Sequence, residues 1–72
     1  MTNQYFNEAV AKMNCAAVRE ELTMMAAKLN NNQGADPYSD NYIADLRNRS
    51  RELGCEMSID WNAQAGKYEV SS

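Results

Sequence analysis

Alternation of apolar and polar residues in the last third of the chain is the feature that most constrains its fold. Residues 55–61 and 67–70 each place an apolar side chain at every second position. This is the periodicity of a strand with one buried face. The apolar positions are Cys55, Met57, Ile59, Trp61, Tyr68 and Val70. The C-terminal third therefore predicts two short strands.

One register pairs the apolar faces of both strands. It matches Trp61 with Tyr68, Ile59 with Val70, and Met57 with Ser72. Cross-strand pairs of this kind set the register of an antiparallel hairpin. Residues 63–66 are left as a four-residue loop, in which Gly66 can supply a positive φ angle. Because an isolated hairpin is marginal in water, its apolar face should pack on the rest of the chain.

The first stretch, from about Asn3 to Leu29, predicts one long helix. It contains no proline or glycine and is rich in good helix formers. Thr2 or Asn3 can cap its start. Its apolar residues form two overlapping stripes, the first with Phe6, Val10, Met13 and Ala17, the second with Val18, Leu22, Met25 and Leu29.

The two stripes together are wider than one packing seam needs, covering an arc of about 160°. Such a helix would be about 39 Å long, whereas a domain of this size is about 29 Å across. Either the helix breaks or a partner covers the part that overhangs. We favour the second alternative, with Val18, Leu22, Met25 and Leu29 as a candidate protein interface.

A second, shorter helix is predicted from about Tyr38 to Leu53. The asparagine-rich segment before it reads as a solvated connector. Asp36 and Pro37 suit a helix start, and Gly54 suits its end. The expected inward stripe is Tyr42 or Ile43, Leu46, Ser50 and Leu53. The chain thus predicts a single α+β domain over residues 1–72, with two helices followed by a hairpin packed on them.

A domain this small usually needs a disulfide, a metal ion or oligomerisation for stability. There is no histidine and there are only two cysteines, so a structural zinc site is not expected. A disulfide between Cys15 and Cys55 would contribute about 3–4 kcal/mol. However, the N-terminus does not resemble a secretory signal. We therefore expect two buried free thiols and a cytoplasmic protein.

The net charge of −3 is spread along the chain. It weighs against broad electrostatic binding to nucleic acid or to anionic membranes. No apolar run approaches the ~20 residues that a membrane span requires. We therefore expect no membrane association.

The inventory of catalytic groups is poor. Without histidine, the usual general base for a serine or cysteine nucleophile is missing. Asp36 and Asp40 lie one helical turn apart, but acidic residues are also favoured at a helix start. The glycines are isolated, so no phosphate-binding loop is present. We expect neither enzyme activity nor a cofactor.

Arg47, Arg49 and Arg51 form the densest basic cluster. They predict an alternative function in nucleic-acid binding or regulation. However, Arg47 and Arg51 should share a helix face from which Arg49 points away. Positive charge is also favoured near a helix C-terminus. A structural role is the stronger interpretation.

Trp61 and Tyr68 are candidates for a binding hot spot, with Lys67 beside them. Packing across the hairpin is the default role for such a pair. A further alternative is a small-ligand pocket, for instance for a nucleotide, formed between protomers near Tyr42, Trp61 and Tyr68.

The function that these features favour is a non-enzymatic protein-binding module, an inhibitor or adaptor that acts by occlusion. The wide apolar arc of the first helix and the open edges of the hairpin favour self-association, with a homodimer as the first expectation. In size and character, though by no motif, the chain resembles small phage-encoded proteins that block host defence, anti-CRISPR proteins among them. That resemblance implies a host-cytoplasmic inhibitor.

Overall fold

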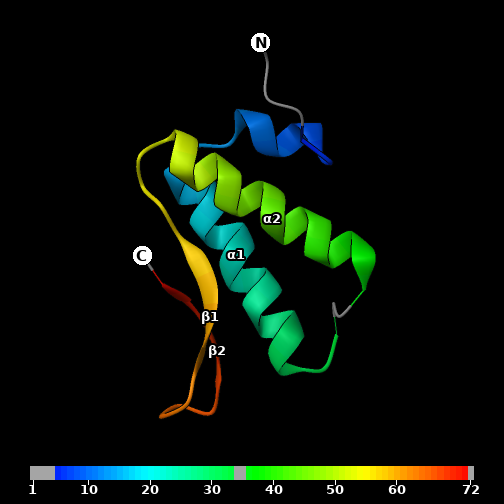
Figure 1. The fold of residues 1–72 in the computed structure, drawn as a ribbon, viewed down its shortest axis with the longest axis vertical. Coiled ribbons are helices and arrows are strands. Elements are labelled where there is room, and N and C mark those ends of the chain that lie inside the picture. The colour runs from blue at the N-terminus through cyan, green and yellow to red at the C-terminus, as the bar shows by residue number, and fades with distance from the viewer. Residues whose placement is uncertain (1–4, 34–35, 72) are drawn as a thin grey trace.

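The computed structural model of the chain describes residues 5–33 and 36–71. Its elements, in order, are the 3₁₀-helix η1 (Glu8–Lys12), α1 (Cys15–Asn30), α2 (Pro37–Glu52), β1 (Ser58–Asn62) and β2 (Lys67–Ser71). Figure 1 shows α2 crossing α1, the hairpin running alongside α1, and η1 lying against α2. The predicted α+β architecture of two helices and a packed C-terminal hairpin is confirmed.

The core lies where α1 meets α2 and the hairpin. Its buried apolar residues are Val10, Val18, Leu22, Met25, Leu46 and Met57. Burying one such side chain is worth about 1.5–3 kcal/mol. Because this core is small, buried hydrogen bonds and the Cys15–Cys55 disulfide contribute a large share of the stability of the fold.

The hairpin has the register that the alternation predicts. β1 and β2 are antiparallel, with Trp61 opposite Tyr68 and Ile59 opposite Val70. The expected partner of Met57, Ser72, lies outside the described residues. Gly66 has a φ of 69°, and its N–H donates to the carbonyl of the last β1 residue over 2.8 Å.

β1 begins at Ser58, three residues later than the alternation suggests. The preceding residues are bonded to α2 instead. The N–H of Cys55 donates to the carbonyl of Ser50 over 3.0 Å, and that of Met57 donates to the Ser50 hydroxyl over 2.9 Å. Ser50 is fully buried, so a single serine hydroxyl fixes where the hairpin leaves the helix layer.

α2 follows its sequence signals closely. The carboxylate of Asp36 accepts from the N–H of Ser39 over 2.7 Å, and Pro37 is the first helical residue. Gly54, just past the helix, has a φ of 79°. The predicted stripe does face inward, with Leu46 and Ser50 fully buried and Tyr42, Ile43 and Leu53 packed against the core.

The prediction of one continuous first helix is wrong. The chain forms η1, becomes extended at Met13 and Asn14, and then begins α1. The Asn14 side chain accepts from the N–H of Ala17 over 2.8 Å and caps α1. The Met13 carbonyl accepts from Nε of Arg49 over 2.9 Å, a bond that a continuous helix would lose.

The break also removes the predicted overhang. η1 folds back on α2 and buries Val10. The backbone N–H of Asn7 donates to the buried carboxylate of Asp45 over 2.6 Å. The predicted caps Thr2 and Asn3 lie outside the described residues.

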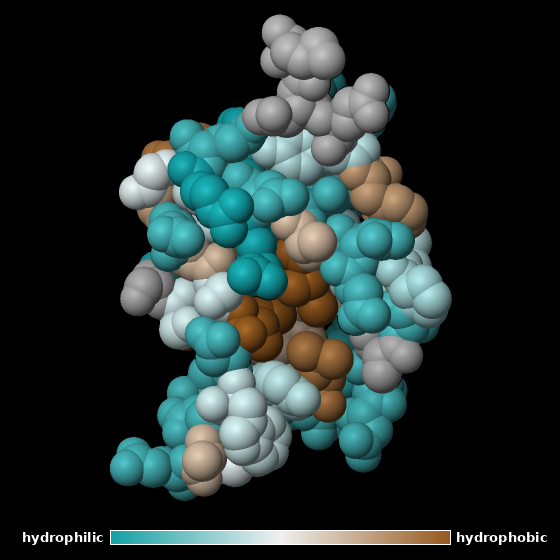
Figure 2. Space-filling model, in the orientation of Figure 1, coloured by the Kyte–Doolittle hydropathy of each residue, from teal (hydrophilic) through white to brown (hydrophobic). Residues whose placement is uncertain are grey.

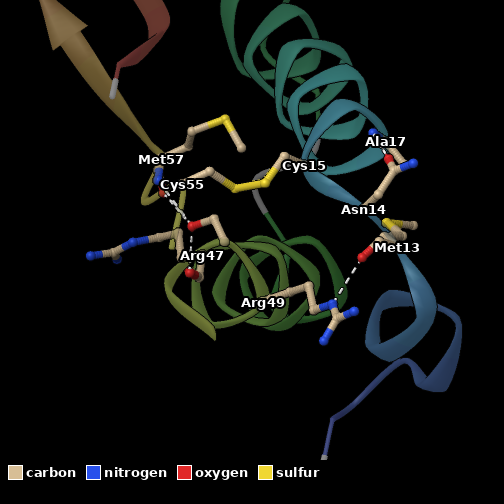
Figure 3. The surroundings of a disulfide bond; sticks show 9 residues. Met13, Asn14, Cys15, Ala17, Arg47, Arg49, Cys55 and Met57 are labelled. Carbon is tan, nitrogen blue, oxygen red and sulfur yellow. Dashed lines mark hydrogen bonds between the residues drawn. A yellow bond between two sulfur atoms is a disulfide. The ribbon is translucent and has the colours of Figure 1, made fainter. Parts of the chain in front are cut away.

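The expectation of free thiols is also wrong, because Cys15 and Cys55 form a disulfide. Figure 3 shows this bond joining the start of α1 to the segment that follows α2. The helix break places Cys15 at the first position of α1, beside the chain that returns from α2. The two Cα atoms lie 6.4 Å apart, within the ordinary range for a disulfide.

Candidate protein-binding surface

An aromatic pair stands near the tip of the hairpin. Trp61 is 57% exposed, whereas its cross-strand neighbour Tyr68 is half-buried. Their ring centroids are 5.1 Å apart in an edge-to-face arrangement, which contributes about 0.5–1.5 kcal/mol beyond area burial. Tyr68 thus holds the Trp61 ring in place while leaving much of it open to solvent.

β2 is anchored to α1 by one side chain. The Asn30 amide accepts from the N–H of Tyr68 over 2.7 Å and donates to the carbonyl of Tyr68 over 3.0 Å. The outer edge of β2 is therefore closed at this point by the last residue of α1. Residues from 19 to 30 of α1 and from 67 to 70 of β2 line a groove beside this contact.

The face of the hairpin opposite the core is polar throughout. The hydroxyls of Ser71 and Ser58 donate to Oδ2 of Asp60 over 2.5 and 3.1 Å. These bonds, with that of Ser71 the stronger, lower the pKa of the exposed Asp60 carboxyl below its usual value. Nearer the tip, Glu69 accepts from Asn62 over 2.8 Å and lies 3.8 Å from the Lys67 amine.

The predicted interface on the first helix lies mostly inside the chain. Val18, Leu22 and Met25 are buried against α2 and the hairpin, and Leu29 is half-buried. These side chains offer a partner little surface. The second apolar stripe is explained by packing within the chain, since α1 is covered on two sides.

The three arginines do not form one surface. Arg49 is turned toward the N-terminal segment, where it bonds the Met13 carbonyl and lies 3.4 Å from a carboxylate oxygen of Glu52. Arg47 points the other way, as Figure 3 shows. Arg49 is therefore structural.

Arg47 and Arg51 line a groove at the base of the hairpin, together with Ser58 and Ser71. Arg51 lies 3.7 Å from the Glu56 carboxylate, with both side chains largely exposed. Within residues 5–33 and 36–71, no carboxylate lies within ion-pair distance of Arg47. Arg47 therefore makes no ion pair here, although its charge contributes to the lowered pKa of the Asp60 carboxyl.

Tyr42 is separated from the hairpin aromatics within one chain. Its hydroxyl donates to the Glu21 carboxylate over 2.6 Å. Burial first, and then this hydrogen bond, raise the pKa of Tyr42. Glu21 and Asn30 are nine residues apart on α1, which places them on opposite sides of the helix. The structure therefore does not bring Tyr42 together with Trp61 and Tyr68, and a pocket between protomers stays a prediction.

Phe6 and Tyr38 form a second exposed aromatic group, which the sequence does not predict. Phe6 and Tyr38 are 53% and 57% exposed, with centroids 5.1 Å apart in an edge-to-face arrangement, and Tyr38 stacks on Tyr42 at 6.3 Å. The two segments meet only because the first helix breaks and folds back. No local pattern marks this contact.

In the described part of the chain, no three or more histidine, cysteine, aspartate or glutamate side chains gather as a metal site. None of its helices is long and apolar enough to span a membrane. The chain matches no protein-family model, no curated protein and no solved structure.

Proposed function

We propose that this chain is a non-enzymatic protein-binding module, an inhibitor or adaptor, that engages its partner through the hairpin. The exposed Trp61 supports this proposal most directly. An indole is costly to leave in water, and tryptophan is enriched at the centres of binding interfaces. Here it is held by Tyr68, which in turn is anchored by Asn30. A preordered aromatic side chain loses little entropy on binding.

The hairpin replaces the first helix as the contact surface in this proposal. Val18, Leu22 and Met25 are buried, so they give no support to self-association through α1. A homodimer stays a prediction. That the chain acts like the phage-encoded inhibitors it resembles in size and character also stays a prediction. A cytoplasmic location also stays a prediction, and the Cys15–Cys55 disulfide weighs against it because reducing compartments disfavour disulfides.

Nucleic-acid binding receives less support. Arg49 is engaged within the chain and Arg51 is compensated by Glu56, which leaves Arg47 as the main candidate. A single arginine on a chain of net charge −3 provides little of the phosphate neutralisation on which such binding depends.

Capture of partners by the tagged protein from nuclease-treated lysate tests the proposal, with light scattering on the eluted complex. The informative variant is Trp61→Ser. Met24→Ser is its matched control, because Met24 lies on α1 and is also about half exposed, at 52%. We expect a stoichiometric protein that wild type and Met24→Ser retain and Trp61→Ser loses. Equal retention by all three proteins would contradict a role for the hairpin, and nucleic acid recovered instead from untreated lysate would favour the arginines.

A further inference from the structure

The two edges of the hairpin differ. In an antiparallel pair, residues that bond across the ladder alternate with residues whose N–H and C=O point outward. Both backbone groups of Tyr68 bond to Asn30, so Tyr68 and its partner Trp61 are an outward-pointing pair. By the same alternation Ile59, two residues earlier, also points its backbone groups away from β2.

The outer edge of β1 is therefore an edge that no other strand pairs with among the described residues. It presents the N–H and C=O groups of Ile59 and Trp61, four hydrogen-bonding groups in a row. No hydrogen bond outside the hairpin engages either backbone among the residues that the structure describes. Exposed edges of this kind are templates for another strand, whereas the edge of β2 is closed by α1.

An apolar hollow adjoins the open edge. Figure 2 shows the most hydrophobic atoms of this face gathered over the middle of α1, between the hairpin and α2. The hairpin packs on α1 mainly through β2, and β1 has no extensive contact with α2. Ile59 and Ile43 are partly buried beside the core. Ile43 lies one turn before Arg47 on α2, and Arg47 lines the groove that also contains Ser58 of β1.

We propose that the outer edge of β1 receives one extended segment of a partner protein, which adds a third strand to the hairpin. This inference rests on the proposed protein-binding function and specifies how the partner is held. Backbone hydrogen bonds to Ile59 and Trp61 supply affinity, and every second side chain of the segment enters the hollow. Trp61, on the same face of the hairpin, closes over the end of the added strand.

The charge of the groove defines the chemistry of the segment. Arg47 stands beside the Ser58 end of β1 and forms no ion pair among the described residues, and its charge acts on the Asp60 carboxyl only from beyond ion-pair distance. An aspartate or glutamate at the matching end of the segment would form a charge-assisted hydrogen bond with this guanidinium. The preferred ligand is thus a strand of alternating apolar residues with one acidic residue near its end.

A second copy of this chain fits the edge poorly. Full antiparallel overlap of two β1 strands pairs outward Ile59 with outward Trp61 and sets Asp60 against Asp60. Like charges directly opposite each other destabilise a sheet, and each copy already carries a net charge of −3. The helices of the second copy would also have to fit beside α2, which crosses α1 next to the hairpin (Figure 1).

Selection from a displayed library of random ten-residue peptides on the immobilised full chain tests this inference. Enriched peptides are synthesised, and their affinities are measured by the change in emission of Trp61, the only tryptophan. Each peptide is also made with N-methyl groups on alternate residues, in either of the two phases. In an added strand only one phase faces β1, so the other phase is a matched control.

We expect enriched peptides with apolar residues at every second position and an acidic residue near one end. One N-methylation phase should weaken binding at least about tenfold, and the other should not, because only one removes hydrogen bonds to the edge. Binding should protect the amides of Ile59 and Trp61 from hydrogen exchange. Arg47→Glu should weaken binding about tenfold, whereas Arg19→Glu, on the β2 side of α1, should leave it unchanged.

Peptides with helical spacing, equal tolerance of both N-methylation phases, or unprotected Ile59 and Trp61 amides would overturn strand addition. So would a library that yields no binder. In each case the proposed function is judged separately, by whether Trp61→Ser loses the captured partner that Met24→Ser retains.

Discussion

The ionisation of Tyr42 is coupled to the stability of the fold. Burial and the hydrogen bond to Glu21 raise its pKa above the ordinary value of 10.0, so the fold stabilises the neutral phenol. This contribution is fully present below the unfolded pKa and is lost as pH rises through the higher folded value. Tyr42→Phe removes the bond and should lower the free energy of unfolding by about 1 kcal/mol near pH 8.

Urea unfolding of wild type and Tyr42→Phe at about pH 8 and about pH 11 checks this coupling. The stability difference between them should shrink at the higher pH. Tyr38→Phe is the control, because Tyr38 is exposed and its hydroxyl donates no hydrogen bond among the described residues. A difference that stays constant over this range would contradict the coupling.

Ser50 is the polar residue on which the hairpin's exit from α2 depends. Its hydroxyl accepts from the N–H of Met57 over 2.9 Å and donates to the Arg47 carbonyl over 2.7 Å. Ser50→Ala would leave a buried N–H without a partner, at a cost of about 1–3 kcal/mol in unfolding free energy. Hydrogen exchange at the Met57 amide should accelerate. Ser58→Ala, nearer the surface, should change stability by less than about 0.5 kcal/mol, and an equal effect of both substitutions would rule out this role.

At the scale of whole elements, the hairpin depends on α1 through Asn30. Asn30→Ala removes both bonds to the Tyr68 backbone and should lower the free energy of unfolding by about 1–2 kcal/mol. The Tyr68 amide should exchange faster with solvent. Asn31→Ala is the matched control, since the neighbouring Asn31 side chain makes no hydrogen bond to the described hairpin residues. An unchanged exchange rate at Tyr68 would show that β2 is held by other contacts.

The elements that the sequence predicts correctly are those whose signals are local. The period of two in β1 and β2, with Trp61 opposite Tyr68, needs no knowledge of the rest of the chain. The same holds for Asp36 and Gly54 at the ends of α2. The same local pattern singles out Trp61 and Tyr68 as a candidate pair, but it does not predict that Trp61 is exposed, because packing across the hairpin is the default role for such a pair.

The elements that it misses depend on distant partners. The first helix breaks at Asn14, which caps α1 through a local bond, and the break is held by Arg49, which bonds the Met13 carbonyl from 36 residues away. Helix propensities alone take no account of these competing hydrogen bonds. The pattern of one helix cannot distinguish a core that is covered on two sides from an interface, so it predicts a partner for the stripe on α1 that α2 and the hairpin cover. The Asn30 anchor spans 38 residues and has no local signal.

At the scale of the molecule, the chain is elongated, with extents of 40 × 24 × 16 Å. Such a shape buries little apolar surface for its length. The disulfide joins residues 40 positions apart and links the start of α1 to the chain between α2 and the hairpin. It therefore ties together the three main elements that form the core, at the point where the first helix breaks.

Replacing both cysteines, as Cys15→Ser with Cys55→Ser, should lower the free energy of unfolding by about 3–4 kcal/mol, because the unfolded chain regains the entropy of a long open loop. A thiol reductant should lower the melting temperature of the wild type toward that of the double variant and should leave the variant unchanged. Alkylation without reductant, followed by intact mass measurement, checks the bond directly. Two alkylated cysteines in the folded wild type would show free thiols, and a small core alone would then have to hold the domain together.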